Sequence, residues 1–98
     1  MAAPAQPKTI SGVQYLEAPQ PVYPPLARRA GEEGKVILRV LVSQQGRAEQ
    51  VELRISSGSD RLDEAARQSV LKARFRPHLE DVLAVAVYAL VSINFSIQ

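Results

Sequence analysis

Apolar and polar residues alternate with a period of two in three segments of the chain, residues 35–43, 47–56 and 85–98. This period predicts β-strands with one buried face. The first two segments are joined by Ser43-Gln44-Gln45-Gly46, in which Gly46 is free to take a positive φ, so we expect an antiparallel hairpin. A straight strand over the third segment would span about 45 Å at roughly 3.3 Å per residue. The residues expected to face the core are Val36, Leu38, Val40, Val42, Val51, Leu53, Ile55, Val85, Val87, Ala89, Val91, Ile93, Phe95 and Ile97.

A helical period separates the second strand from the third. The apolar stripe that predicts an amphipathic helix consists of Leu62, Ala65, Ala66, Ser69, Val70 and Ala73. Asp60 is the expected N-cap, and Asp63 lies in the first turn, where an acidic side chain is favourable. Phe75-Arg76-Pro77 ends the helix because the residue before a proline avoids the α conformation. A shorter helix is predicted over residues 26–30, between Pro24-Pro25 and Gly31.

The order of elements is therefore short helix, strand, strand, helix, strand. We predict an α+β domain in which a three-stranded antiparallel sheet carries one helix on a face. If the last strand pairs with the first through a right-handed crossover, it becomes an edge of the sheet. An edge leaves a row of unpaired backbone donors and acceptors, to which an extended peptide can add as a further strand.

Prolines mark a division of the chain near Gln20. Six of the seven prolines fall in residues 1–25, which carry only Lys8 and Glu17 as charged residues. This composition predicts that residues 1–19 are a flexible linker and residues 20–98 the folded domain. The start has no basic segment followed by an apolar run, as a signal peptide would, and no apolar stretch is long enough to span a membrane. We expect either a cytosolic protein or a fragment whose targeting segment lies upstream.

Composition excludes several classes of function. The chain has 98 residues, which suits one domain, and its net charge of +2 is small for a nucleic-acid binder. It has no cysteine and a single histidine, which excludes thiol nucleophiles, disulfides and the usual zinc or iron–sulfur sites. Ser56 and Ser57 have no partner base and no nucleophile-elbow context. We therefore expect no catalytic residue, no metal and no cofactor.

Short motifs in residues 20–98 together resemble a known family. They are Tyr23-Pro24, Ala27, Gly31-Glu32-Glu33-Gly34-Lys35-Val36, Gly46, Ser56-Ser57-Gly58, Leu62-Asp63-Glu64-Ala65-Ala66, Phe75-Arg76-Pro77 and Asn94-Phe95. In this order and spacing they resemble the C-terminal domain of TonB, the energy transducer of Gram-negative bacteria. One departure is residues 78–83, which contain no glycine where many members have a glycine-containing loop, so the start of the last strand is not defined by the resemblance.

The resemblance implies a periplasmic domain and a set of partners. In full-length relatives an N-terminal anchor, absent from this sequence, lies in the inner membrane and contacts ExbB and ExbD, which use the proton-motive force. The C-terminal domain binds the TonB box, an N-terminal segment of outer-membrane receptors. Pulling on the box remodels the receptor plug and admits iron–siderophore, haem or cobalamin. Residues 1–19 would then be the end of a periplasmic spacer.

The resemblance also implies the binding residues. The edge of the last strand, Val91, Ser92, Ile93, Asn94 and Phe95, would pair with the box, because main-chain pairing tolerates boxes of different sequence. Gln20, Val22 and Tyr23 resemble the segment that lies beside the box in relatives. An equally supported interpretation of Tyr23 is that it caps the core at the start of the domain.

Other functions stay open at this point. A TolA-like or another TonB-like envelope adaptor would have the same general fold and a different partner. A nucleic-acid-binding α+β module would need exposed aromatic residues on the sheet, and of the last strand's aromatics only Tyr88 lies on the polar face. A homodimer formed by strand exchange is also compatible with an open edge. The basic residues Arg67, Lys72, Arg74 and Arg76 form either a solvated face or a surface attracted to acidic receptor segments or the cell wall.

Overall fold

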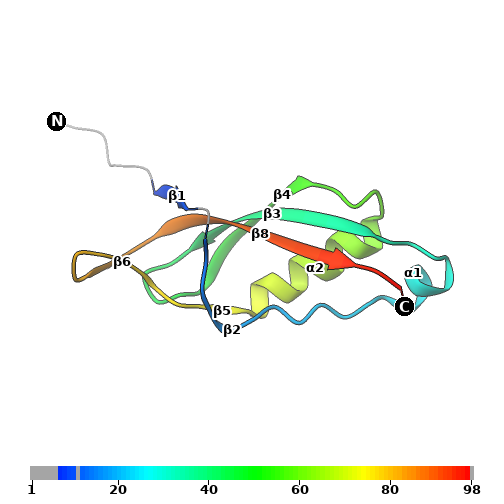
Figure 1. The fold of residues 1–98 in the computed structure, drawn as a ribbon, viewed down its shortest axis with the longest axis horizontal. Helices are drawn as coiled ribbons and strands as arrows, with labels where there is room; N and C mark the ends of the chain where they lie inside the picture. The colour runs from blue at the N-terminus through cyan, green and yellow to red at the C-terminus, as the bar shows by residue number, and fades with distance from the viewer. Residues whose placement is uncertain (1–6, 11, 98) are drawn as a thin grey trace.

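The computed structural model describes residues 7–10 and 12–97. Its main sheet has four strands in the order β1-β8-β3-β4, with β1 at Lys8–Ile10, β3 at Gly34–Val42, β4 at Ala48–Ile55 and β8 at Val87–Phe95 (Figure 1). The antiparallel trio β8-β3-β4 confirms the predicted sheet and its strand order. The structure adds a fourth strand, β1, which the sequence analysis did not predict and which pairs with β8 in parallel. With only three residues, β1 is too short to show a period-two pattern.

The remaining elements surround this sheet. Helix α2 (Asp60–Lys72) packs against β3 and β4, and α1 (Pro25–Arg29) is the predicted short helix. Two small sheets pair β2 (Tyr15–Glu17) with β5 (Arg74–Phe75), and β6 (His78–Glu80) with β7 (Leu83–Val85). The chain from β2 to α1 runs alongside α2, and the β6–β7 hairpin projects from one end of the molecule (Figure 1).

The core lies between the inner face of the sheet, α2 and the chain that precedes α1. The inward side chains of β3 and β8 are buried as predicted, together with Leu62, Ala66 and Val70 of α2 and with Phe75. Fully burying a valine or leucine side chain contributes about 1.5–3 kcal/mol to the stability of the fold. The core residues of the two strands are Val36, Leu38, Val40, Val42, Val87, Ala89, Val91, Ile93 and Phe95.

Strand β4 is less well covered than its alternation predicts. Val51 is half-buried, but Leu53 and Ile55 keep 47% and 55% of their surface exposed. The pairing register with β3 shifts between Ile37 and Leu38, and Ile55 therefore lies opposite the outward-facing Ile37. The prediction that Ile55 faces the core is wrong because a β-bulge interrupts the alternation, which periodicity alone does not show.

Gly46 takes the positive φ that the hairpin prediction required. Its φ is 84°, and its carbonyl oxygen accepts a hydrogen bond of 2.8 Å from the backbone N–H of Phe75. A Cβ atom at this position would lie 2.1 Å from the carbonyl oxygen of Phe75. The close approach of β5 to the turn therefore requires glycine.

The start of α2 differs from the prediction by one residue. The N-cap is Ser59, whose hydroxyl accepts a hydrogen bond of 3.4 Å from the N–H of Leu62, and Asp60 is the first helical residue. Asp63 has a wider role than the favourable charge expected of it. Its carboxylate accepts hydrogen bonds from the hydroxyls of Ser56 and Ser57 and from the Ser57 N–H, and so joins the end of β4 to α2.

The last strand begins later than its alternation predicts. Val85 belongs to β7, and β8 begins at Val87 after a single intervening residue. The β6–β7 hairpin turns at Asp81, which has a φ of 56° and therefore takes the left-handed conformation usually supplied by glycine. Aspartate is one of the few other residues that adopt this conformation readily. The left-handed conformation of Asp81 therefore explains how residues 78–83 form a tight turn without glycine.

Within the predicted linker of residues 1–19, two short segments are paired with the domain. Ile10 ends β1, which lies on β8, and Tyr15 begins β2, which lies opposite Phe75. The N–H of Arg76 donates a hydrogen bond of 2.8 Å to the carbonyl oxygen of Gln14. The part of the linker in residues 1–6 lies outside the described residues. The predicted division between linker and domain at Gln20 stays a prediction. The contacts of Ile10, Gln14 and Tyr15 lie on the linker side of it.

We predict that Asp63→Asn lowers the free energy of unfolding at pH 7 by about 1 kcal/mol, because an amide cannot accept all three hydrogen bonds. Partial burial raises the pKa of Asp63, but the hydrogen bonds from Ser56 and Ser57 outweigh burial and lower the pKa overall. The stabilisation is therefore present above the unfolded pKa of about 3.9 and is lost as the pH falls through the folded value.

Urea denaturation at pH 7 and pH 3 would measure this difference. The native chain and Asp63→Asn should differ at pH 7, and the difference between them should be smaller at pH 3. Asp60→Asn is the matched control, because no side-chain donor in the described residues bonds to that carboxylate, and it should have a smaller effect. Equal stability of the native chain and Asp63→Asn at pH 7 would contradict the role of Asp63.

Candidate functional site

The two sides of β8 differ in how fully they are paired. On one side, all nine residues from Val87 to Phe95 pair with β3. On the other side, β1 pairs only with Val87, Tyr88 and Ala89. Among the described residues, no strand lies against the outer side of residues 90–95, which we call the open edge. About half of the backbone N–H and C=O groups in such an edge point outward, where another strand can bond to them.

The side chains of the open edge divide between two faces. Val91, Ile93 and Phe95 point into the core and are almost fully buried, whereas Ser92 and Asn94 are exposed on the outer face of the sheet. The three buried residues can therefore offer only backbone groups to a partner. The structure places all five predicted edge residues on the open edge, but it contains no partner, so their role in binding stays a prediction.

Tyr23 contacts the C-terminal end of β8. Its ring packs edge-on against Phe95 with 5.4 Å between centroids, and the Arg28 guanidinium lies 5.0 Å from the ring centre. Its hydroxyl donates a hydrogen bond to the carbonyl oxygen of Glu32. Burial and the nearby carboxylate of Glu33 raise the pKa of Tyr23 despite the opposing charge of Arg28, so the hydroxyl keeps its proton. These contacts support the alternative interpretation of Tyr23 as a cap on the core.

Gln20 and Val22 lie beside α2, and their role as contacts beside the open edge stays a prediction. Both line a hollow of about 100 Å³ against α2, together with Ser69 and Lys72. A larger hollow of about 590 Å³ extends from Gln20 toward Leu16 along the same helix. No sequence pattern indicated this groove, because it forms between two segments that are far apart in the chain. Val22 is 75% exposed and can be reached by a partner.

The outer face of the sheet is tied together by Arg39. Its guanidinium lies 3.7 Å from the centre of the Tyr88 ring on β8, and one of its nitrogens lies 3.5 Å from the Glu52 carboxylate on β4. All five aromatic residues lie in the described part of the chain, and Tyr88 is the only one on this face. Because Arg39 covers its ring, the face offers no free platform for stacking nucleic-acid bases.

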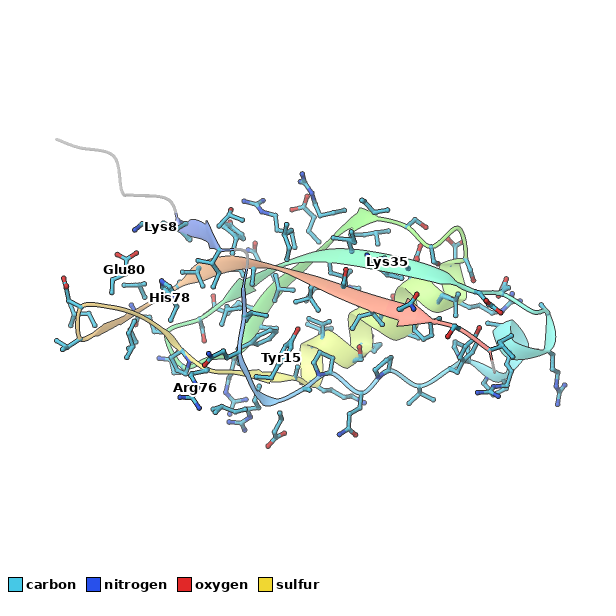
Figure 2. All side chains as sticks on the ribbon, in the orientation of Figure 1. Lys8, Tyr15, Lys35, Arg76, His78 and Glu80 are labelled. Carbon is cyan, nitrogen blue, oxygen red and sulfur yellow. The ribbon has the colours of Figure 1, made fainter. Side chains whose placement is uncertain are left out.

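The basic residues gather differently from the predicted cluster. Arg67 pairs with Glu64 on α2, whereas Arg47 lies opposite Arg74 in an antiparallel bridge just beyond the C-terminal end of that helix. Arg76 lies close to β5 (Figure 2). Arg47 and Arg74 are both exposed, so their facing positions make this part of the surface locally positive.

The described residues contain no constellation for metal or membrane chemistry. No group of three or more histidine, aspartate or glutamate side chains is placed to hold a metal ion within residues 7–10 and 12–97. In the same residues, no helix has the length and apolar character needed to cross a bilayer.

Comparisons with known proteins agree on one family. The family model for the C-terminal domain of the Gram-negative bacterial TonB protein matches residues 19–97. Protein TonB of Vibrio cholerae is 34% identical over 79 residues, which cover 81% of this chain and 32% of that protein. Protein tonB2 of Pseudomonas aeruginosa is 38% identical over 84 residues, which cover 86% of this chain and 31% of that protein. The chain thus spans about a third of the length of these relatives.

Solved structures show the same fold. The solution NMR structure of the TonB C-terminal domain of Pseudomonas aeruginosa superimposes with a TM-score of 0.74 at 30% sequence identity, covering 88% of this chain and 87% of that one. The TonB2 protein of Vibrio anguillarum superimposes with a TM-score of 0.65 at 25% identity, covering 100% of this chain and 95% of that one.

We predict that the ring and the hydroxyl of Tyr23 stabilise the domain separately. Tyr23→Phe removes the hydrogen bond to Glu32 and should lower the free energy of unfolding slightly. Tyr23→Ala also removes the ring from Phe95 and Arg28 and should lower the free energy of unfolding severalfold more. Urea denaturation of the two variants measures both values. If Tyr23→Ala were as stable as the native chain, Tyr23 would not be a cap of the core.

Proposed function

The chain belongs to the TonB C-terminal domain family of Gram-negative bacteria, and we propose that it binds an extended segment of a partner by strand addition at the open edge of β8. Members of this family are non-enzymatic energy transducers. The observation that carries the proposal is the unequal pairing of β8, which has a complete ladder on one side and an open edge at residues 90–95 on the other.

Main-chain pairing suits a domain that must bind segments of different sequence. The hydrogen bonds come from backbone groups, which every partner possesses, and side chains add preference only where they meet Ser92, Asn94 or neighbouring residues. The buried side chains of Val91, Ile93 and Phe95 keep the strand straight and fix its position. The edge therefore binds through its shape and its hydrogen-bonding groups more than through a specific pocket.

The ladder between an added strand and β8 would be shorter than the ladder between β8 and β3, and this difference suits the transmission of force. An added strand can pair with six residues of the open edge, whereas β8 pairs with β3 over nine residues and is packed into the core. When the added strand is pulled along its length, the shorter ladder carries the same load with fewer hydrogen bonds. We expect the partner to detach before the domain loses β8, so that the domain can be used again.

The partner that the family supports is the TonB box of an outer-membrane receptor, together with its plug. The TonB family is periplasmic and anchored in the inner membrane. We propose the same location for this protein, with residues 1–19 at the end of a spacer and with ExbB and ExbD acting through an N-terminal anchor. The transported substrate would be an iron–siderophore, haem or cobalamin. Gln20 and Val22 are proposed contacts beside the edge.

The two other interpretations have less support. A TolA-like adaptor would not account for a match to the TonB family over residues 19–97. A homodimer is compatible with the structure, because no strand in the described part of the chain pairs with the outer side of β4, and β8 has the open edge. Pairing between copies would compete with partner binding at β8, so the two can be separated by varying the protein concentration.

We predict that a synthetic TonB box peptide shifts the backbone amide resonances of residues 90–95 in the labelled chain. The decisive variants lie in the peptide, so they cannot unfold the protein. N-methylation of the peptide residues whose N–H groups face β8 removes donors from the ladder and should weaken binding at least about tenfold, since each net hydrogen bond contributes about 1 kcal/mol. N-methylation of the alternate residues should have little effect.

Isothermal titration would give the affinities, and a repeat at a second protein concentration controls for homodimers. An alternating pattern of strong and weak effects supports strand addition. A uniform effect of methylation, or shifts confined to the groove between Gln20 and α2, would overturn the proposal. Failure of several box peptides to bind at millimolar concentration would also overturn it.

A further inference from the structure

Strand β1 occupies part of the side of β8 to which a partner would add. Lys8, Thr9 and Ile10 pair in parallel with Val87, Tyr88 and Ala89, directly before the open edge begins. We propose that β1 is a displaceable strand of the chain itself, which limits the free edge to six residues and must leave when a longer partner segment pairs with β8. This inference rests on the proposed function and adds a competitor from within the chain.

The contacts that hold β1 are few. Its main side-chain link is the ion pair between the Lys8 ammonium and the Glu80 carboxylate, at 2.7 Å, on β6 (Figure 2). The Lys8 and Glu80 side chains are 70% and 40% exposed, and exposed ion pairs contribute little to stability. Ile10 is only partly buried. A strand of three residues with one exposed ion pair is a weakly held element.

The packing around Ile10 is also open toward the surface. A hollow of about 310 Å³ lies against this segment and is lined by Ile10, Val13, Val42, Pro77 and Val87, among others. The inward side chains of β8, those of Val87 and Ala89 included, are almost fully buried, so the open space lies on the β1 side. The empty space means that Ile10 has fewer neighbouring atoms than a core residue, and the loss of its contacts costs correspondingly less.

The release of β1 would be local, because the chain is fixed again immediately after it. The carbonyl oxygen of Gln14 accepts the hydrogen bond from Arg76, and the Tyr15 ring packs against Phe75 with 5.3 Å between centroids. Residues up to 13 can therefore leave without disturbing β2. The ladder between β8 and β3 does not involve β1 and would remain complete.

Two consequences follow for binding. Only residues 11–14 join β1 to β2. Because this tether is short, β1 competes with a partner segment for Val87–Ala89 at an effective concentration on the order of millimolar. A segment that needs only the open edge avoids this competition, whereas one that reaches Val87 does not. Exchange would also free residues 8–13 and lengthen the tether by up to about 20 Å at roughly 3.4 Å per residue.

The test compares two peptides of equal net charge, both capped at their ends. The first is a six-residue box peptide that covers the open edge, and the second extends it by three residues toward Val87. Lys8→Glu places a second carboxylate beside Glu80 and should release β1. We expect it to bind the nine-residue peptide about two- to fivefold more tightly and the six-residue peptide unchanged. Lys8→Glu/Glu80→Lys restores an ion pair and should restore the native affinity.

Amide resonances of residues 87–89 show directly whether β1 has left. If Lys8→Glu does not shift them, Lys8→Glu/Ile10→Asp adds a charge at the partly buried position and provides a stronger release. The inference is wrong if neither variant shifts these resonances, or if release leaves the affinity for the nine-residue peptide unchanged. If the proposed function holds, the six-residue peptide still binds in either case. In this experiment the proposed function would fail only if the native chain bound neither peptide.

Discussion

The structure depends on how β8 is held: two of its sides are fixed by the rest of the domain, and a third stays open to a partner strand. Its backbone pairs with β3 along its whole length, and its inward side chains fill the core beside α2. These two interactions hold the strand in an extended conformation. The backbone groups of residues 90–95 on the remaining side cannot be satisfied by the rest of the described chain, and they remain available for water or a partner strand.

The other elements define where this available stretch begins and ends. At its C-terminal end, Tyr23 packs against Phe95 and joins β8 to the chain before α1. At its N-terminal end, β1 covers Val87, Tyr88 and Ala89 and is attached through Lys8 to Glu80. Across the outer face, Arg39 links β8 to β4 through Tyr88 and Glu52. The edge is thus short, straight and rigidly supported, which lowers the entropic cost of adding a strand.

Much of this arrangement follows from patterns in the sequence, and the exceptions have physical causes. Period-two alternation and the helical stripe predicted β3, β4, β8 and α2. The order of connections predicted β8 as an edge strand, which holds for residues 90–95 but not for Val87–Ala89, where β1 pairs with it. Three-residue β1 carries no periodic signal, and a bulge turned Ile55 away from the core. Ser59 and Asp60 are both good caps, so sequence alone does not choose between them. The groove beside Gln20 depends on tertiary contacts that no local pattern encodes.

Native-state hydrogen exchange along β8, with and without a nine-residue box peptide, tests the central claim most directly. Amides that face β3 should be protected in both states, whereas the alternate amides of residues 90–95 should exchange rapidly in the free protein and become protected when the peptide binds. Protection that appears instead on β4 or α2, with residues 90–95 unchanged, would show that the open edge of β8 is not where the partner adds.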